Sequence, residues 1–221
     1  MGPTILTQDQ REAIGVVGQD EAIAAAFYLT GGTALSAYYL RHRYSDDVDF
    51  FTREEQFPQL AVEAVVKRIK DVIGGTDIEY RRIYDRRVFF IKKDPTELKI
   101  EFTTYPFPFL HEPTPIDGIR VDSLEDIAAN KIMALMDRID AKDFVDLYVL
   151  VTQKQMMFRQ LLGLVKKKFD FTIDPLALGS EFAKVSVLTA LPRMVIPLEL
   201  AQLKDFFSDQ AKLLRADVII D

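Results

Sequence analysis

A group of prolines divides this sequence into two parts with different hydrophobic patterns. The prolines are Pro106, Pro108, Pro113 and Pro115, and proline interrupts helices and sheet pairing because it lacks an N–H and fixes φ. Before them, short segments alternate apolar and polar residues, as half-buried strands do. After them, apolar residues recur at helical spacing almost to the end of the chain. We therefore predict an α+β fold, with a mixed sheet and flanking helices in residues 1–115 and a helical bundle in residues 116–221.

The individual elements can be predicted by residue range. In the first part, the capping and periodicity signals favour helices over 8–26, 33–40 and 58–72, the second of them capped by Thr33. Strands are predicted over 27–30, 48–51, 77–83, 87–92 and 98–105. Residues 94–97, Asp-Pro-Thr-Glu, are turn formers, so the last two strands should form a hairpin. In the second part, helices are predicted with breaks near 140, 170–175 and 192–197.

The composition limits the chemistry that is open to the chain. Cysteine is absent and histidine occurs only twice, which excludes disulfides and disfavours a zinc site. Any metal should be a hard cation bound by oxygen, namely Mg²⁺ or Mn²⁺. The net charge of −6 argues against nucleic acid contacting the whole surface. Basic residues are nevertheless concentrated in two places, at Arg81, Arg82, Arg86, Arg87, Lys92 and Lys93 and at Lys166, Lys167 and Lys168.

Neither a targeting segment nor a membrane span is predicted. The first fifteen residues are polar and lack the basic and apolar regions of a signal peptide. No stretch approaches the roughly 18 apolar residues that a transmembrane helix needs. We therefore expect a cytoplasmic protein with no membrane partner.

Acidic residues alternate with apolar residues in two of the predicted strands. Asp47 and Asp49 are separated by one valine, and Glu101 lies between two apolar residues. Because successive strand side chains point to opposite faces, all three acids face away from the core if the strands are neighbours. Asp46 is expected in the turn before the strand. Clustered carboxylates repel one another, and Mg²⁺ would relieve that repulsion while activating an attacking oxygen. The alternative is that these are solvated faces of amphipathic strands.

A glycine pair precedes the second predicted helix. Gly31 and Gly32 let the backbone approach a ligand closely, and Thr33 adds a hydroxyl. The N-terminus of a helix offers unpaired N–H groups and a partial positive charge, which favour phosphate. An ordinary turn is the alternative, and the carboxylates some fifteen residues later favour the phosphate interpretation.

Polar residues at the exit of that helix have two interpretations. His42, Arg43 and Ser45 could contact a phosphate or a base. His42 and Arg43 would equally suit the negative end of the helix dipole as a C-terminal cap.

One lysine in the helical part falls on an apolar stripe. Lys131 is four residues after Ile127 and four before Leu135, so it must either extend to the surface or meet a buried anion. A triphosphate or a nearby carboxylate would serve. Further along, Asp143 and Asp146 share a flank of the next helix, where Lys142 and Asp146 could form an ordinary surface pair.

The sequence resembles the AbiEii/AbiGii toxin family of the nucleotidyltransferase superfamily, which has the polymerase β-like fold. The first match is Gly-Gly-Thr-Ala-Leu at 31–35, followed by His-Arg-x-Ser-x-Asp-x-Asp-Phe-Phe at 42–51. The second is the segment 126–135, continuing through Arg138 to Lys-Asp-x-x-Asp-Leu-Tyr-x-Leu at 142–150. The resemblance covers roughly residues 27–150, and we recognise no signature in residues 151–221.

The resemblance implies a nucleotidyltransferase-like sheet domain and Mg²⁺-dependent transfer of a nucleoside monophosphate from an NTP to an acceptor. In such toxins the acceptor can be tRNA, and a cognate antitoxin is the usual partner. By this match Asp47, Asp49 and Glu101 would bind metal, with Glu101 at a position where the family often has Asp. Catalysis would involve these three together with Lys131 and Asp146. Nucleotide contacts are expected from Gly31, Gly32, Thr33, His42, Arg43, Ser45, Lys142 and Asp143.

Two other functions remain open from the sequence. One is a non-catalytic nucleotide-binding or interaction module that has kept the fold, although such a module has no need of three adjacent acids. The other is a transferase that modifies a protein or a small molecule. RNA is favoured as the acceptor if the first basic cluster adjoins the carboxylates, because Lys and Arg bind phosphates.

Overall fold

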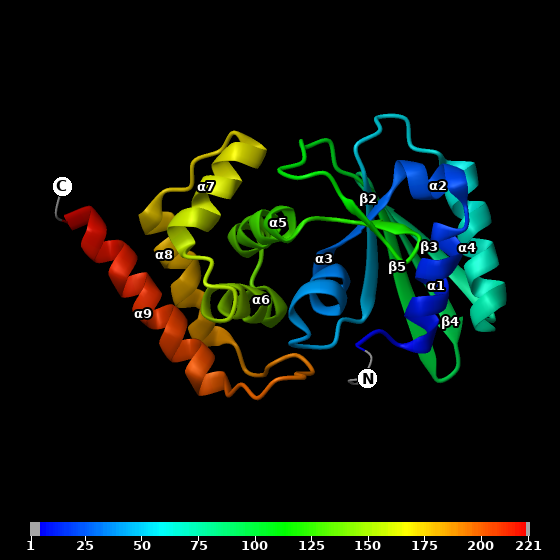
Figure 1. Ribbon diagram of the computed structural model, residues 1–221. Helices are drawn as coiled ribbons and strands as arrows, with labels where there is room; N and C mark the ends of the chain where they lie inside the picture. The colour runs from blue at the N-terminus through cyan, green and yellow to red at the C-terminus, as the bar shows by residue number, and fades with distance from the viewer. Residues whose placement is uncertain (1–4, 220–221) are drawn as a thin grey trace. The chain divides into compact units, whose positions relative to one another are not determined.

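The computed structural model describes residues 5–219, with side chains described as far as residue 214. Residues 1–4 and 220–221, the ends of the two predicted domains, lie outside the described part. The chain forms two compact units: Met1–Tyr39 with Tyr44–Ser123, and Leu40–Arg43 with Leu124–Asp221. We call these the sheet unit and the helical unit (Figure 1). The chain thus enters the helical unit for four residues before it returns to the sheet unit. The domain boundary after residue 115 stays a prediction.

The sheet unit is built on a seven-stranded mixed sheet in the order β3-β4-β5-β2-β1-β7-β6. Its strands are β1 (Tyr28–Thr30), β2 (Asp47–Thr52), β3 (Asp77–Ile83), β4 (Arg86–Lys93), β5 (Thr96–Thr104), β6 (Thr114–Ile116) and β7 (Ile119–Val121). The pairs β2/β5 and β1/β7 are parallel, and the other pairs are antiparallel. The mixed sheet confirms the predicted fold class.

Helices cover the two faces of this sheet unequally. The helices α1 (Gln8–Gly18), α2 (Glu21–Ala26) and α4 (Gln59–Ile73) lie on one face, and α3 (Gly31–Ala34) lies on the other (Figure 1). The helix α3 continues as the π-helix η1 (Leu35–Leu40). A capping box between Thr7 and Gln10 starts α1, and the left-handed Gly74 (φ 74°) ends α4.

The core of the sheet unit lies between the sheet and α1 and α4. Val48 and Phe50 of β2 and Ile100 and Phe102 of β5 are fully buried, and the Phe50 and Phe102 rings stack with centroids 5.1 Å apart. The helices contribute a further apolar layer of Ala13, Ile14, Val17, Val62, Val65, Val66 and Ile69. Burying each large apolar side chain stabilises the fold by about 1.5–3 kcal/mol. These contacts fix which face of each strand points outward.

One predicted element is confirmed by the structure, and several others need correction. The hairpin is confirmed, since Lys93 pairs with Thr96 across its turn. The helix predicted over 8–26 is two helices, because Asp20 caps a second one. Thr33 was wrongly predicted as a cap: the helix begins at Gly31, and the N-cap is Thr30. The strands β6 and β7 were not predicted, because three residues are too few to show an alternating pattern.

The helical unit contains α5 (Leu124–Asp137), α6 (Ala141–Thr152), α7 (Phe158–Phe169), α8 (Pro175–Ala183), the 3₁₀ turn η2 (Lys184–Val187) and α9 (Leu200–Ile219). This confirms the predicted helical character of the second part. The breaks near 140 and 170–175 coincide with the N-caps Asp140 and Asp174. Across the described residues, no helix combines the length and hydropathy of a transmembrane span.

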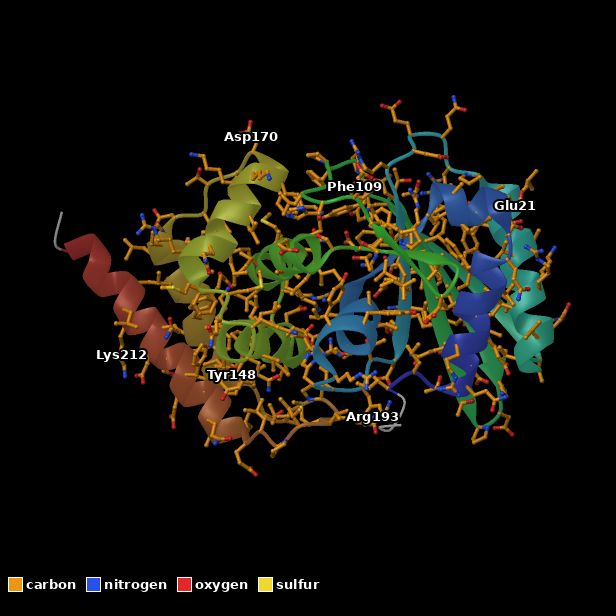
Figure 2. All side chains as sticks on the ribbon, in the orientation of Figure 1. Glu21, Phe109, Tyr148, Asp170, Arg193 and Lys212 are labelled. Carbon is orange, nitrogen blue, oxygen red and sulfur yellow. The ribbon has the colours of Figure 1, made fainter. Side chains whose placement is uncertain are left out.

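Aromatic side chains form much of the core of the helical unit. Phe144, Phe158, Phe182 and Phe207 are buried, and their ring centroids lie 4.7–5.1 Å apart in the pairs 158/182, 144/207 and 182/207. Ring contacts of this kind, edge-on in the pairs 144/207 and 182/207, add to the stabilisation from burial. Tyr148 of α6 extends the cluster toward α9 (Figure 2) by packing on Phe206 at 5.0 Å.

A buried ion pair links α5 to α7. Lys168 and Asp126 are joined through Nζ and Oδ1 at 2.5 Å, and both side chains are almost completely buried. Only Lys166 and Lys167 of the second basic cluster are therefore exposed. Removing one partner of such a pair leaves an uncompensated charge in a medium of low polarity.

We expect Asp126→Ala to lower the free energy of unfolding by about 3–5 kcal/mol, because Lys168 would lose its counter-ion. The double variant Asp126→Leu with Lys168→Met should recover most of that loss, since no charge is then buried. Urea-induced unfolding followed by circular dichroism measures both. A loss below about 1 kcal/mol in the single variant would contradict the role given to the pair.

Candidate active site

The three sheet carboxylates share one face of the sheet unit. The strands β2 and β5 are direct neighbours, with Asp47 opposite Lys99 and Asp49 opposite Glu101. The intervening apolar residues of both strands are buried on the other face. The prediction that these acids lie on the face away from the core is therefore confirmed, while their convergence on a metal ion stays a prediction. Asp46 is exposed and precedes β2, as predicted.

The glycine turn lies against this row of carboxylates. Gly31 has a φ of 70°, and a Cβ atom added to it would overlap with Asp49 Oδ2. A side chain at this position would displace the carboxylate and strain the backbone. The Thr33 hydroxyl donates a hydrogen bond to the carbonyl oxygen of Asp47. The predicted phosphate-binding segment and two of the predicted metal ligands are thus adjacent in the fold.

Cations from the chain itself bind the carboxylates of Glu101 and Asp47. Arg86 donates to Glu101 through Nε and Nη2, both at 2.5 Å. The Thr103 hydroxyl donates to the same carboxylate at 2.7 Å. Lys99 Nζ lies 2.9 Å from Asp47 Oδ2. Glu101 is the most enclosed of these groups, with 3% of the residue exposed.

The residues present suit a hard divalent cation by the chemistry of their donors. Asp47, Asp49 and Glu101 offer carboxylate oxygens, which Mg²⁺ and Mn²⁺ prefer. The absence of a side chain at Gly31 leaves room for the Asp49 carboxylate. In the conformation seen, however, no three acidic or histidine side chains of the described residues are grouped to hold a metal ion. Glu101 and Asp47 are turned toward Arg86 and Lys99 instead.

A further acid on this face was not found from the sequence. Asp122, just after β7, is fully buried, and its Oδ2 accepts a hydrogen bond from the Thr30 hydroxyl at 2.7 Å. Thr30 lies opposite Asp49 on the neighbouring strand. No local pattern marked Asp122, because the strand before it has only three residues. Arg86 could have been placed by counting register from the turn of the predicted hairpin.

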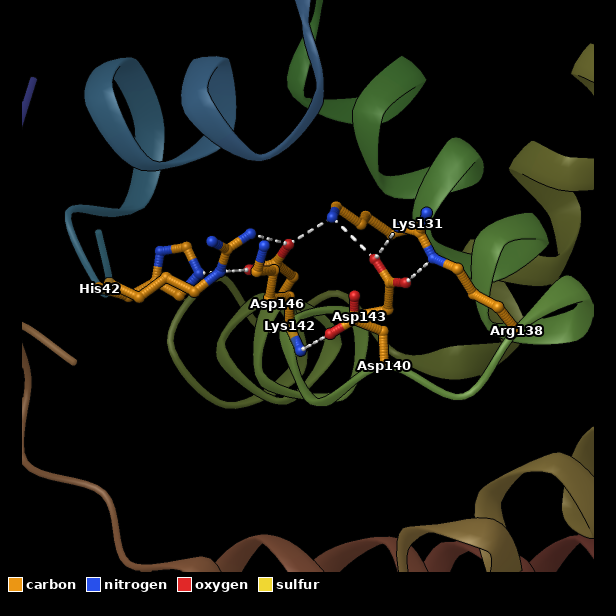
Figure 3. A network of polar contacts seen from close by, with 8 residues as sticks. His42, Lys131, Arg138, Asp140, Lys142, Asp143 and Asp146 are labelled. Atoms are coloured by element: carbon orange, nitrogen blue, oxygen red, sulfur yellow. Dashed lines mark hydrogen bonds and ion pairs between the residues drawn. The ribbon is translucent and has the colours of Figure 1, made fainter. Parts of the chain in front are cut away.

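Five other predicted site residues form a network in the helical unit (Figure 3), namely His42, Arg43, Lys131, Asp143 and Asp146. Asp146 is its centre: Arg43 donates to both carboxylate oxygens at 2.6 and 2.8 Å, and His42 Nε2 lies 2.6 Å from Oδ1. Lys131 Nζ lies 2.6 Å from Asp146 and 2.9 Å from Asp143. Of the two partners foreseen for Lys131, carboxylate or triphosphate, the structure provides the carboxylate.

The short segment Leu40–Arg43 is fixed in this unit by more than its side chains. The carbonyl oxygen of His42 accepts hydrogen bonds from the backbone N–H groups of Val195 and Ile196. Arg43 also forms an isolated β-bridge with Met194. His42 and Arg43 therefore pair with the backbone of residues 194–196. Neither the phosphate interpretation nor the helix-cap interpretation predicted this contact.

Ion pairing sets the protonation of this network. Burial raises the pKa of Asp146, but the attraction of Lys131 and Arg43 outweighs it, so the pKa lies well below its ordinary value. Asp143 behaves likewise: burial raises its pKa, and Lys131 and Arg138 lower it further than that. Burial lowers the pKa of Lys131, while Asp146 and Asp143 raise it above its ordinary value. Asp146, Asp143 and Lys131 are thus charged at neutral pH.

Two predicted contact residues have plainer positions. The backbone N–H of Lys142 donates to Asp140, the N-cap of α6. The carbonyl oxygen of Ser45 accepts from the Gln10 side chain at 2.7 Å, and the Ser45 side chain is buried. Their assignment to nucleotide binding stays a prediction.

Comparison with solved structures agrees with this architecture. JHP933 from Helicobacter pylori superposes with a TM-score of 0.60 at 24% identity, over 95% of this chain and 90% of that one. MenT4, a nucleotidyltransferase toxin from Mycobacterium tuberculosis, gives a TM-score of 0.52 at 15% identity, over 95% and 90% of the two chains. At these identities the likeness shows that the fold is shared.

Comparison of sequences extends the match to nearly the whole chain. An uncharacterized protein of Aquifex aeolicus is 34% identical over 177 residues, which are 76% of this chain and 79% of that protein. The family described as the nucleotidyl transferase AbiEii toxin of type IV toxin–antitoxin systems matches residues 18–217. The match includes residues 151–217, where no signature was recognised. The chain therefore belongs to the AbiEii family of nucleotidyltransferase toxins.

Proposed function

We propose that the sheet carboxylates transfer a nucleoside monophosphate from an NTP to a hydroxyl of an RNA acceptor, with Mg²⁺ or Mn²⁺ as cofactor. The observation that carries this proposal is the pairing of β2 with β5, which sets Asp49 opposite Glu101 beside the Gly31 turn. In the proposed site, Asp47, Asp49 and Glu101 would hold the metal. When bound, the divalent cation would neutralise charge on the triphosphate and on the departing pyrophosphate.

The chain's own groups account for the remaining steps. The segment Gly31–Thr33 would receive the phosphates through its backbone N–H groups. The acceptor oxygen would attack the α-phosphorus in line with the bond to the β-phosphate. As the new P–O bond forms, that bond breaks and pyrophosphate leaves. The hydroxyl proton would pass to Glu101. The Glu101 carboxylate can act as a base only when Arg86 no longer binds it. Positioning and electrostatic stabilisation are the main contributions.

An RNA acceptor is supported by the charges around the carboxylates. Arg86 and Lys99 lie on the same face as the three acids, and Arg81 lies on that face one strand beyond Arg86. Arg81 is exposed and stacks on Phe90, with its guanidinium carbon 4.8 Å from the ring centroid. Arginine next to a half-exposed ring such as Phe90 is a common surface for single-stranded RNA. A cognate antitoxin would be the protein partner.

The function is tested by incubating the protein with each labelled NTP, Mg²⁺, and total RNA and protein from the same cells. Transfer of label to RNA is expected, and labelling of protein or of small molecules alone would refute the RNA acceptor. Expression of the protein without its antitoxin should arrest growth. Transfer that is unaffected by chelation with EDTA would refute the metal requirement.

Replacing Asp49 should abolish chemistry without unfolding the protein. We expect Asp49→Asn to reduce nucleotide transfer by at least about a hundredfold, since one metal ligand and its charge are lost. The free energy of unfolding should change by less than about 1 kcal/mol, because Asp49 is only half-buried. Growth arrest should be relieved in parallel.

The matched control is Asp46→Asn, which removes a neighbouring acid that is exposed and precedes β2. It should retain transfer close to that of the unaltered protein. Equal activity of the Asp49 variant and this control would overturn the site assignment.

Replacing Asp146, unlike replacing Asp49, should lower the stability of the fold. The buried network supports a structural role for Lys131 and Asp146, while their catalytic role remains a prediction from the resemblance. We expect Asp146→Asn to lower the free energy of unfolding at pH 7 by about 3–5 kcal/mol, because Arg43 and Lys131 lose their counter-ion. The comparison is made by urea unfolding between pH 2 and pH 8.

The pH dependence of stability follows from the direction in which the pKa of Asp146 is shifted. The folded pKa of Asp146 lies below its unfolded value of about 3.9, so its stabilisation is complete above about pH 5 and is lost as pH falls toward the folded pKa. The Asn variant should therefore lose less stability below pH 5 than the unaltered protein does. An unchanged acid limb would contradict the assignment.

A further inference from the structure

The carboxylates on the sheet differ from the buried network of the helical unit in the solvent exposure of the cations that bind them. Glu101 is almost enclosed, with 4% of its side chain exposed, whereas its partner Arg86 is 45% exposed. The fixed member of the pair is the carboxylate, and the arginine reaches it from the open side. An exposed arginine can be exchanged for another cation at little cost in packing.

We propose that a divalent cation and Arg86 compete for Glu101, and that Arg86, once displaced, binds a phosphate group of the substrate. This inference rests on the proposed function and adds a substrate-binding residue to it. Arg86 was assigned only to a basic cluster from the sequence, with no place in the site.

The geometry makes simultaneous binding unfavourable. Glu101 Oε1 already accepts from Arg86 Nε at 2.5 Å and from the Thr103 hydroxyl at 2.7 Å, while Oε2 accepts from Arg86 Nη2 at 2.5 Å. A metal ion on the same oxygens would face the guanidinium charge at close range, and like charges repel strongly where solvent is sparse. The arginine must turn away for Glu101 to become a metal ligand.

The displaced arginine has a chemically matched alternative. A guanidinium presents parallel N–H donors that fit a phosphate as well as they fit a carboxylate. Arg86 opens β4 directly after the turn at Tyr84 and Asp85, at the exposed end of the β3–β4 hairpin. A phosphate would thus replace the carboxylate that the metal takes. Metal binding and phosphate binding would each strengthen the other, since coupling of this kind is reciprocal.

Lys99 is the cation that binds the second acid, Asp47. It binds Asp47 through one contact of 2.9 Å, and Asp47 is 33% exposed. The Lys99–Asp47 pair is weaker and more solvent-exposed, so a metal ion should displace Lys99 more readily than it displaces the two-pronged Arg86. Arg86 is therefore the residue that controls assembly of the three carboxylates, and it is the one to change.

The experiment measures Mn²⁺ binding directly, by electron paramagnetic resonance of free Mn²⁺ during titration, without substrate. Arg86→Gln should bind Mn²⁺ about tenfold more tightly than the unaltered protein, because the competing charge is gone. Arg86→Lys keeps the charge and should stay within about threefold of the unaltered protein. The matched control is Arg82→Gln, an exposed arginine on the other face of β3 that donates to the carbonyl oxygen of Tyr84, which should leave Mn²⁺ affinity unchanged.

Phosphate binding is measured in the same variants by fluorescence anisotropy at saturating Mn²⁺. One arm uses a labelled, non-hydrolysable NTP, and the other uses a labelled single-stranded RNA without nucleotide. Loss of about tenfold in one arm for both Arg86 variants identifies the source of the phosphate. The Lys variant keeps this arm informative if the Gln variant fails to fold.

The outcomes separate this inference from the proposed function. Mn²⁺ affinity that is equal or weaker in Arg86→Gln overturns the competition, and undiminished binding in both anisotropy arms overturns the phosphate role. If the unaltered protein and every variant bind no Mn²⁺, the metal assignment of the proposed function fails as well. A further outcome is that Asp49→Asn abolishes Mn²⁺ binding while Arg86→Gln does not tighten it. That outcome would refute only the competition between Arg86 and the metal ion.

Discussion

The parallel pairing of β2 with β5 is the constraint on which the proposed active site depends. It is a contact between segments some fifty residues apart, and it alone brings Asp49 beside Glu101. A slip of one residue would set Asp49 beside Ile100 or Phe102 and turn Glu101 toward the core. The register is fixed from the other face, where Phe50 and Phe102 stack and are fully buried. Hydrophobic packing thus determines the geometry of the acids without touching them.

Charge compensation follows two designs in this chain. In the Asp126–Lys168 pair and around Asp146, acids and bases are buried together, and the exposed Arg138 lies at the edge of the network. Separating such groups would leave a charge in a nonpolar medium, so they favour one fixed arrangement. At Glu101 only the acid is enclosed, and its partner Arg86 stays in contact with water. The first design suits stability, and the second suits exchange of one cation for another.

Local periodicity explains what could be predicted from the sequence. The alternation around Asp49 and Glu101 predicted a common face if their strands were neighbours, and the helical stripe around Lys131 gave a buried anion as one of two interpretations. Neither pattern carries information about distant partners. Asp146 lies 103 residues beyond Arg43, and no local signal joins His42 and Arg43 to the helical unit. Asp122 was missed for a related reason, since strands of three residues show no period. The catalytic roles of Lys131 and Asp146 remain predictions, because their ion pairs explain their burial without a ligand.

The identity of the third acid fits the exchange at Glu101. The resemblance noted from the sequence places Glu101 where the family often has Asp. The additional methylene extends the carboxylate by about 1.5 Å from the strand, and at that reach it meets both Arg86 and Thr103, whose own positions are directly opposite each other on β4 and β5. A shorter acid would lie nearer to Asp49 and further from the arginine. In the exchange that we propose, glutamate would allow one carboxylate to bind two cations in turn, first the guanidinium of Arg86 and then a metal ion beside Asp49.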